Sequence, residues 1–313
     1  MNHQLLDERR ISLELAENSS SLSEYLGLGA SLYIPTTKPK LRQLLQKKDL
    51  QTTKSIILCL EDAVADRDLS IALKHVEELV SKPLPHDNLF IRPRNIQVLN
   101  HLLSFSGIEQ FQGVVLPKVD EHNLIHYAEI LAQRPEWKVM PTIETSIAFS
   151  RKRLQCLREA CETVINQILC IRIGVNDLFS IFGLKRLSQA TVYDTMLRSV
   201  IDDIVLTFRP NGYFISAPVF DFLDNEAILS QEITRDLAYG LWSKTAIHPQ
   251  QIKIIENHYQ VPCHEVEMAK AILVKNVPAV FKLHGQMCEP VVHRRWAKST
   301  LERARIYGLK SSD

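Results

Sequence analysis

PTIET (Pro141–Thr145) and IRIGVNDL (Ile171–Leu178) are two short apolar runs, and each leads to a carboxylate, Glu144 in the first and Asp177 in the second. A segment long enough for a helix lies between them. In a parallel β/α barrel the ends of successive strands meet at one rim, so the two carboxylates are expected to lie close together. Such a pair suits a hard divalent cation that keeps some waters and takes substrate oxygens as further ligands. The alternative is that Glu144 and Asp177 are two surface acids at strand ends.

The alternation of strand and helix extends through most of the chain. The run SIILCL (Ser55–Leu60) is apolar throughout, as expected for a strand buried on both faces. Apolar patterning predicts strands over residues 31–35, 55–60, 88–92, 113–117, 138–143, 168–173, 213–216 and 243–247. It predicts helices over residues 40–47, 69–80, 98–104, 123–132, 146–160, 191–208 and 225–239, with another that opens at Pro249. This pattern predicts an α/β fold, a (β/α)₈ TIM barrel; a doubly wound open sheet fits the alternation almost as well, but eight strands favour closure.

The barrel pattern stops at Cys263. We therefore divide the chain into an N-terminal extension (1–30), the barrel (31–262) and a C-terminal helical tail (263–313). Within the tail, residues 265–275 and the basic segment 292–307 are predicted helices, and residues 277–290 are a predicted loop. The tail has too few apolar residues to form a domain of its own, so we expect it to pack on its own barrel or on a neighbouring subunit.

Composition and charge exclude several classes of protein. The chain has 313 residues, of which 45% are hydrophobic and 23% charged, as is typical of a globular protein with a sizeable core. A net charge of +1 favours neither nucleic acid nor an anionic membrane as a partner, and no apolar run is long enough to span a bilayer. Residues 1–23 lack the apolar region of a secretory signal. The six cysteines form no CxxC pair, which favours a reduced, cytoplasmic protein.

Charged residues follow several other predicted strands. Glu61 and Asp62 follow the second strand; they either hold metal-bound water or move a proton, or they are an acid pair at a helix N-terminus. Arg92 ends the third strand and suits a bidentate grip on a substrate carboxylate, although a surface arginine near a turn is the plainer interpretation. Lys118 follows the fourth strand and is a Schiff-base nucleophile, a phosphate contact or a solvated lysine. We expect Lys118 to support the site or to contact a cofactor phosphate.

Two further positions carry weaker signals. His248 follows the eighth strand and precedes a proline that begins a helix, so a structural role is favoured over a catalytic one. Glu289 lies in the tail, after a glycine-containing segment and before the basic helix. The sequence has no Walker A, GxGxxG, HExxH or GxSxG motif, so nucleotide hydrolysis, dinucleotide redox chemistry and serine hydrolysis have no visible machinery.

Together these segments resemble the HpcH/HpaI aldolase and citrate lyase superfamily and, within it, the citrate lyase β-subunit-like branch. The resemblance covers about residues 31–307 and rests on SLYIP, LEDAV, FIRPRN, VVLPKV, PTIET, IGVNDL with the later Gly183, and AIHPQQI. LEDAV, IET and GxxDL in this order are specific together, although each is weak alone. The resemblance implies a (β/α)₈ barrel, usually trimeric or hexameric, that cleaves or forms a carbon–carbon bond through a metal-stabilised enolate, with Mg²⁺ (or Mn²⁺) as cofactor. It implies a small carboxylate or an acyl-CoA thioester as substrate.

The resemblance also implies roles for individual residues. Glu144 and Asp177 would be the metal ligands, with Glu144 also beside the substrate, and Arg92 would bind the substrate carboxylate or thioester region. Glu61 and Asp62 would hold metal-bound waters or relay a proton. The last position, Glu289, aligns with a C-terminal acid that serves as an acid/base group, often from a neighbouring subunit.

Several residues depart from the family pattern, and they are the ones expected near an acyl-CoA thioester rather than the metal ligands. Cys59 stands where the family usually has aspartate before Leu-Glu-Asp, and Leu69 and Leu73 stand where the branch often has lysine and arginine. Glu289 replaces the aspartate of the citramalyl-CoA type lyases. Two alternatives therefore stay open. One is a class II aldolase that acts on a free 2-oxo acid without CoA, and the other is a non-catalytic metal-binding barrel that belongs to a biosynthetic assembly.

Overall fold

The computed structural model describes residues 21–310. These residues form two compact units, one of residues 28–254 and the other of residues 21–27 with 255–310. Most of the N-terminal extension expected over residues 1–30 lies outside the described residues. No helix within residues 21–310 is both long and apolar enough to cross a bilayer.

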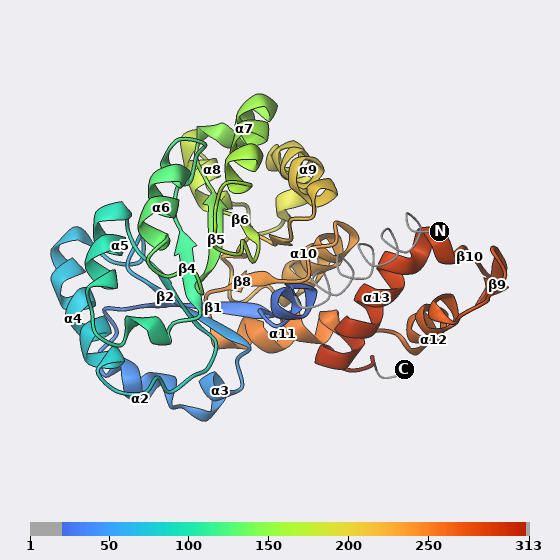
Figure 1. Cartoon of the computed structure of the whole chain (residues 1–313), viewed down its shortest axis with the longest axis horizontal. Helices are drawn as coiled ribbons and strands as arrows, with labels where there is room; N and C mark the ends of the chain where they lie inside the picture. The colour runs from blue at the N-terminus through green and yellow to red at the C-terminus, as the bar shows by residue number, and fades with distance from the viewer. Residues whose placement is uncertain (1–20, 311–313) are drawn as a thin grey trace, which may run out of the picture. The chain divides into compact units, whose positions relative to one another are not determined.

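The larger unit is built around eight parallel strands (Figure 1). They are β1 (Ala30–Pro35), β2 (Ser55–Cys59), β3 (Leu89–Arg92), β4 (Gly113–Leu116), β5 (Lys138–Ile143), β6 (Ile171–Ile173), β7 (Ile215–Ser216) and β8 (Lys244–Ala246). Each strand pairs in parallel with its sequence neighbour, and β8 pairs with β1. A parallel bridge between Ala217, directly after β7, and Lys244 joins the remaining edges. The predicted barrel is confirmed, and the open sheet is wrong.

The strands are apolar because both of their faces are covered. All residues of β2 and β4 are buried, since one face meets the outer helices and the other faces the barrel interior. The carboxyl ends of all eight strands form one rim of such a barrel. Residues that are far apart in the sequence can therefore meet there.

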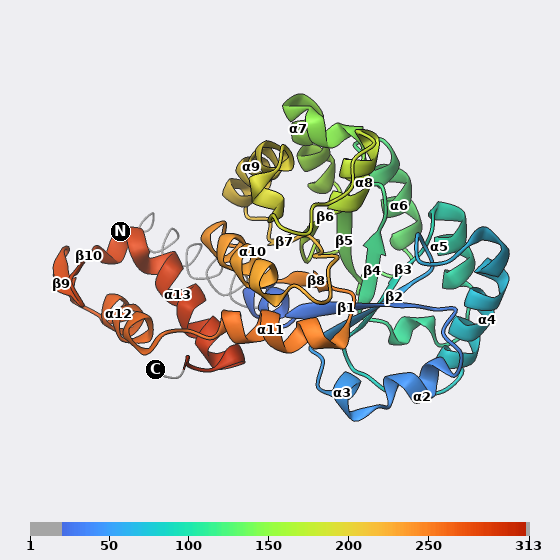
Figure 2. The ribbon, with the colours of Figure 1, turned by 180° about the vertical axis from the view of Figure 1, so that it is seen from behind.

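Helices lie outside the ring of strands (Figures 1 and 2). They are α2 (Leu41–Leu45), α3 (Lys48–Gln51), α4 (Leu69–Val80), α5 (Ile96–Leu103), α6 (Asn123–Leu131), α7 (Arg151–Cys161), α8 (Val175–Ile181), α9 (Leu197–Phe208), α10 (Glu226–Ala238) and α11 (Pro249–Tyr259). The 3₁₀ turns are η1 (Asp66–Asp68), η2 (Ile108–Gln110), η3 (Ser146–Phe149), η4 (Val192–Asp194) and η5 (Arg209–Asn211). In α4 the buried residues Ala72, Val76 and Leu79 recur at helical spacing, which gives the helix one apolar face.

Two predicted helices are interrupted. The helix expected over residues 146–160 is divided into η3 and α7 at Ser150, whose extended backbone and side chain cap the start of α7 by accepting from Arg153 N. The helix expected over residues 191–208 is divided into η4 and α9. Thr191 and Asp194 form a capping box around η4, and Thr195 is extended. Hydroxyl and carboxylate side chains that bond nearby backbone groups compete with a continuous helix, which is why apolar spacing alone missed both breaks.

The smaller unit contains α12 (Cys263–Leu273), a hairpin of β9 (Phe281–Leu283) and β10 (Gln286–Cys288), and α13 (Pro290–Tyr307). Its apolar core comprises Met268, Ala269, Ile272, Cys288 and Ala297. The loop expected over residues 277–290 therefore contains a two-stranded hairpin. His284 and Gly285 both have positive φ, 48° and 80°, as the central residues of a type I′ turn require.

Candidate active site

Charged side chains from successive strand ends meet at the carboxyl rim of the barrel. Glu61 and Asp62 follow β2, Arg92 ends β3, Lys118 follows β4 and Glu144 follows β5. Asp177 lies in α8, the helix after β6. We call these residues the rim cluster: Glu61, Asp62, Arg92, Lys118, Glu144 and Asp177. The sequence predicted each of them as a site residue, and the ion pairs of the structure connect them into one group.

Arg92 links two carboxylates of the rim cluster. Its Nη2 lies 2.8 Å from Glu144 Oε1 and 2.9 Å from Glu61 Oε2. Its side chain is only 11% exposed, and no residue in the described range accepts a hydrogen bond from its Nη1. Arg92 therefore neutralises part of the negative charge of Glu61 and Glu144, and its remaining N–H groups can donate hydrogen bonds to another anion.

Glu144 is the most confined acid of the rim cluster. It is buried, and its Oε1 accepts hydrogen bonds from Arg92 and, at 2.8 Å, from the backbone N–H of Lys118. Burial raises the pKa of Glu144 to about 7; Arg92 opposes this rise, and the charge of Asp177 adds to it. The carboxylate is thus held in place, and a further positive charge would stabilise its ionised form.

Lys118 adopts a backbone conformation that few residues other than glycine adopt, with φ 51°. This conformation presents its N–H to Glu144. Its ammonium Nζ lies 2.6 Å from Glu61 Oε1, 3.1 Å from Asp62 Oδ1 and 3.6 Å from Asp177 Oδ1. Lys118 therefore supports the acids with both backbone and side chain, and its predicted contact with a phosphate stays a prediction.

Glu61 and Asp62 have different surroundings although they are adjacent. The Glu61 side chain is 3% exposed and the Asp62 side chain 56% exposed. Glu61 Oε2 accepts a hydrogen bond from Asp62 N at 2.8 Å. The alternative of an acid pair at a helix N-terminus is wrong, because the next helical turn, η1, begins only at Asp66.

Asp177 reaches the rim from a helix that the sequence did not predict. The strand β6 ends at Ile173, and Gly174 leads directly into α8, whose first turn carries Asp177. The placement of Asp177 at a strand end is therefore corrected to a helix start. The helix α8 has only seven residues, of which Val175, Leu178 and Phe179 are buried, and only Gly174 separates it from the strand, so it gave no separate signal in the sequence. Burial raises the pKa of Asp177, and the charge of Asp62 adds to the rise.

Gly174 makes room for Glu144. A Cβ at position 174 would lie 2.2 Å from Glu144 Oε2 and 2.5 Å from Glu144 Cβ. Because these are closer than any non-bonded contact, the glycine of IGVNDL is required by the side chain on the neighbouring strand end. In the sequence this glycine is one residue of the IGVNDL motif, and nothing in the pattern indicates its role.

We expect Gly174→Ala to lower kcat/KM by about a hundredfold or more, because the added methyl group must displace the Glu144 carboxylate. Steady-state kinetics and thermal unfolding of the variant test this. Gly183→Ala is the matched control: its φ of 64° is strained for alanine, but a Cβ there meets no atom within 4 Å. The control should lose some stability and keep its turnover. Equal loss of turnover in both variants would contradict a specific role for Gly174.

Comparison with known proteins decides the family. The model of the C–C bond lyase family of the TIM-barrel fold matches residues 22–309. This chain belongs to the C–C bond lyase family. Membership confirms the carbon–carbon lyase and the barrel predicted from the sequence. It also agrees with the resemblance to citrate lyase β-subunit-like proteins.

Individual relatives of this C–C bond lyase are distant but match it over most of their length. Citrate lyase subunit beta of Escherichia coli (strain K12) is 25% identical over 280 residues, 82% of this chain and 87% of that protein. The (3S)-malyl-CoA thioesterase of Cereibacter sphaeroides is 26% identical over 265 residues, 82% of this chain and 84% of that protein. CitE of Mycobacterium tuberculosis, solved with magnesium, acetoacetate and coenzyme A, is 22% identical with a TM-score of 0.66 and covers 88% of this chain and 98% of that one. The last likeness establishes the shared fold.

The donor set of this C–C bond lyase fits a divalent cation. Within residues 21–310, Glu61, Asp62, Glu144 and Asp177 form ion pairs with two cations, Arg92 and Lys118, so four ionised carboxylates leave two negative charges. No three His, Cys, Asp or Glu side chains among residues 21–310 form a metal site by themselves. Mg²⁺, however, commonly takes one or two protein carboxylates and fills its other positions with water and substrate. Glu144 and Asp177 meet that requirement. The contact of Lys118 with Asp177, at 3.6 Å, is the longest of its three ion pairs, so Asp177 is the acid that Lys118 engages least.

The raised pKa of Glu144 predicts that metal affinity depends on pH. Since a ligand carboxylate must be ionised and the pKa of Glu144 is about 7, Mg²⁺ affinity should fall by about tenfold per pH unit below pH 7 and level off above it. For the metal-free protein the sign is opposite: a carboxyl whose folded pKa is raised stabilises the fold at low pH and loses that contribution as pH rises through about 7. Calorimetric Mg²⁺ titrations from pH 5.5 to 8.5 test the first statement. A flat profile there contradicts it.

Neither of the two weaker sequence signals, His248 and Glu289, forms an ion pair with the rim cluster in the described part of the chain. His248 Nδ1 accepts from the backbone N–H of Gln250 at the start of α11, at 3.3 Å, in keeping with the structural role expected. Glu289 belongs to the smaller unit, where it precedes α13 and donates its N–H to His293 Nδ1 at 3.1 Å. Its assignment as an acid/base group stays a prediction.

A residue that the sequence reasoning missed supports the acids after β2. Arg94 donates to the carbonyl oxygens of Leu60 and Val64 and pairs with Asp66. These contacts bridge both ends of the loop that carries Glu61. The signal was present, because Arg94 is the second arginine of the quoted segment FIRPRN.

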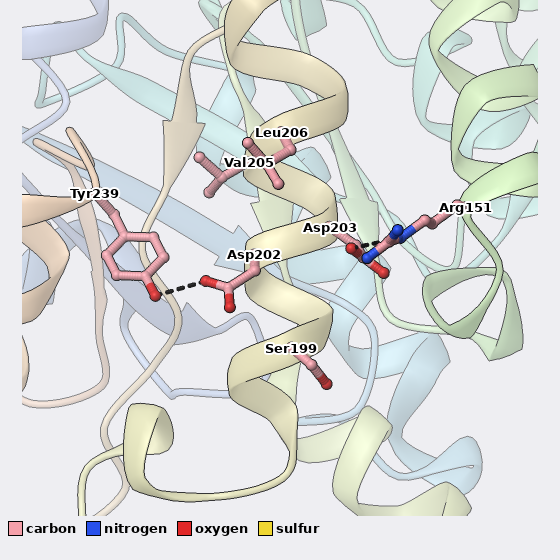
Figure 3. A pocket seen from close by; sticks show the side chains of 7 residues that line it. All are labelled: Arg151, Ser199, Asp202, Asp203, Val205, Leu206 and Tyr239. Carbon is pink, nitrogen blue, oxygen red and sulfur yellow. Dashed lines mark hydrogen bonds and ion pairs between the residues drawn. The ribbon is translucent and has the colours of Figure 1, made fainter.

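A surface pocket of about 340 Å³ lies elsewhere, on the outer helices (Figure 3). Residues from α7, α9 and the end of α10 line it, and ion-pair and hydrogen-bond partners occupy its walls: Arg151 with Asp203 at 2.8 Å, and Tyr239 with Asp202 at 2.6 Å. None of the rim cluster residues lines this pocket. It is therefore separate from the candidate active site.

Proposed function

We propose that this protein is a Mg²⁺-dependent (or Mn²⁺-dependent) lyase that cleaves or forms a carbon–carbon bond in a small carboxylated substrate, with an acyl-CoA thioester as the favoured class. The observation that carries the proposal is the pair Glu144 and Asp177, two acids with raised pKa beside an arginine that has an unused donor. The alternative class II aldolase would use the same residues on a free 2-oxo acid.

The names of relatives support the thioester class. One relative is a malyl-CoA thioesterase, and the solved CitE holds coenzyme A with magnesium and acetoacetate. Against this, Leu69 and Leu73 on the first turns of α4 offer no positive charge to a CoA phosphate. On the rim, Lys118 is a candidate for such a contact, because its side chain is 45% exposed.

The rim cluster contains groups suited to binding and proton transfer. Mg²⁺, when bound, supplies Lewis acid chemistry at the carbonyl whose neighbouring bond breaks. Arg92 Nη1, which has no acceptor among residues 21–310, donates to the substrate carboxylate. Burial holds Glu61 and Arg92 away from bulk water, which strengthens each of these contacts.

Glu61 and Asp62, the two acids after β2, have different roles in proton transfer. Burial raises the pKa of Glu61. Burial acts in the same direction on Asp62, but hydrogen bonds with Glu61 and Lys118 outweigh it and lower the pKa of Asp62. Two neighbouring carboxyls with pKa values pushed apart are suited to opposite roles. The exposed, ionised Asp62 accepts the hydroxyl proton in the cleavage direction, and Glu61 positions it through the Asp62 N–H.

Product analysis tests the proposed function. The purified protein is assayed with Mg²⁺, and with EDTA, on 3-hydroxyacyl-CoA thioesters that carry a carboxyl group on C3 and on 4-hydroxy-2-oxo acids. Metal-dependent release of a shorter acyl-CoA is the expected result, and it should be lost in Asp62→Asn. Pyruvate release without CoA would establish the aldolase instead. Metal binding without release from either class would favour the non-catalytic barrel.

We also propose that the protein is a homo-oligomer, a trimer or hexamer, in which Glu289 acts in a neighbouring subunit's site. The support is the apolar exposure around Glu289: Met287, Val291 and Val292 are 62%, 89% and 68% exposed. If Glu289 acts across subunits, mixing the inactive variants Glu289→Gln and Glu144→Gln should restore part of the turnover, because some sites receive both native residues. Mass photometry gives the subunit number, and a monomer that turns over would contradict the proposal.

Six free cysteines support a reducing, cytoplasmic location.

A further inference from the structure

Arg172 is a second arginine of the barrel that the mechanism does not use. It belongs to β6 and is 2% exposed. Its guanidinium reaches Met140 of β5, Thr245 of β8 and the ring of Tyr33 on β1. Because these strands lie on both sides of β6 around the ring, a side chain can contact all of them only from inside the barrel. Arg172 therefore carries a positive charge in the barrel interior.

The contacts of Arg172 are all with neutral groups. Nη2 donates to Thr245 Oγ1 at 2.7 Å, and Nη1 lies 3.7 Å from Met140 Sδ. The Cys170 thiol also contacts Arg172, and burial raises its pKa to about 11, so it stays protonated at neutral pH. The Tyr33 ring lies 5.4 Å from the guanidinium carbon. In the described range no carboxylate forms an ion pair with Arg172.

An unpaired buried charge is costly. The effective penalty for taking an ion out of water is several kcal/mol unless a counter-charge meets it. The other buried arginine of the barrel, Arg186, has such a counter-charge in Glu232. Arg172 has no counter-charge. A buried arginine without a carboxylate partner is expected where a bound ligand supplies the negative charge.

Tyr33 connects this interior charge with the rim. Its ring lies 5.9 Å from the guanidinium carbon of Arg92 as well as 5.4 Å from that of Arg172. Tyr33 is only partly buried, and its hydroxyl has no hydrogen-bond partner among residues 21–310. Burial raises the pKa of Tyr33, so the hydroxyl keeps its proton and can donate it to an anion.

We propose that Arg172 and Tyr33 form a subsite for a second anionic group of the substrate. Arg172 supplies the positive charge and Tyr33 the hydrogen bond, while Arg92 binds the first carboxylate. The substrate class is then a dianion, such as a dicarboxylate or its equivalent within a thioester. This inference rests on the proposed function, since it assigns a selectivity to the same rim.

Calorimetric titration in the presence of Mg²⁺ tests the subsite. The probes are L-lactate and L-malate, which share a 2-hydroxy acid group and differ by a second carboxylate. The full-length protein should bind malate at least about tenfold more tightly than lactate. Arg172→Met should lower malate affinity by about tenfold and leave lactate affinity within about twofold. Tyr33→Phe, which removes only the hydroxyl, should reduce the malate preference by a smaller factor, and Arg172→Lys should retain part of it.

Stability separates the subsite from a structural role. Removing an unpaired buried charge should leave the thermal midpoint of Arg172→Met unchanged or higher. Arg186→Met is the matched control, because it breaks a buried pair; it should lower the midpoint and keep the ratio of malate to lactate affinity. Equal binding of both probes by the native protein, or an equal loss of both in Arg172→Met and Tyr33→Phe, would overturn the subsite alone. If neither probe binds with Mg²⁺ while a shorter acyl-CoA is still released in the product analysis, the subsite alone fails; if that release is absent as well, the proposed function fails with it.

Discussion

Replacing Glu144 by glutamine is expected to lower kcat/KM by about a thousandfold or more while the barrel stays folded. The amide is a neutral and weaker ligand for a hard cation, and Arg92 loses one of its two carboxylate partners. The new side chain has the same shape, so it still fits against Gly174 and can accept from Lys118 N. Because burial raises the pKa of Glu144, its ionised form costs stability near neutral pH, and the neutral glutamine should be at least as stable.

Two measurements separate lost chemistry from lost folding in this variant. Steady-state kinetics report the turnover, and thermal unfolding with and without Mg²⁺ reports binding, since a ligand at a hundred times its Kd stabilises by about 2.7 kcal/mol. The native protein should gain this stabilisation and Glu144→Gln should not. Glu121→Gln is the control: Glu121 also pairs with an arginine, Arg153 at 2.7 Å, but among the described residues it forms no hydrogen bond or ion pair with the rim cluster. Full metal-dependent turnover in Glu144→Gln would falsify its role as a ligand.

Lys244→Met is expected to cause the largest loss of stability, about 3–5 kcal/mol. Lys244 Nζ lies 2.9 Å from Glu232 Oε1 and 2.8 Å from Asp236 Oδ2, and all three side chains are fully buried. Arg186 also pairs with Glu232, and Tyr193 donates to Asp236 at 2.6 Å. Without Lys244, two buried carboxylates share one remaining cation. The charge that is left uncompensated, rather than lost packing, causes the destabilisation.

Denaturant unfolding at two pH values tests this explanation. Burial raises the pKa of Asp236 to about 6, so Asp236 can be protonated in the folded protein at pH 5 and is ionised at pH 8. The loss in Lys244→Met should therefore be smaller at pH 5 than at pH 8. Lys74→Met provides the exposed control, since its contact with Glu78 is 3.9 Å long and both side chains are mostly in water. That variant should change stability by no more than about 1 kcal/mol. An unchanged unfolding midpoint for Lys244→Met would rule out a stabilising network.

The sequence by itself determined the alternation of strands and helices and the residues of the rim. Both are local properties. A strand buried on two faces is a continuous apolar run, as in Ser55–Leu60, and Arg92 can be recognised from the sequence as the residue that ends its strand. Strand ends in a closed barrel share a rim, so the closeness of Glu144 and Arg92 could be expected without coordinates. The helix breaks at Ser150 and Thr195 were missed because single side-chain caps override apolar periodicity.

Only the tertiary structure decided how these residues meet. The 2.2 Å that a Cβ at Gly174 would leave to Glu144 depends on the spacing of two neighbouring strands, and Asp177 reaches the rim from a helix start. The neutral surroundings of Arg172 depend on side chains from β1, β5 and β8, and no pattern along β6 records them. Contacts between strands far apart in the sequence are set by closure of the barrel, whereas propensity and periodicity act within a few residues.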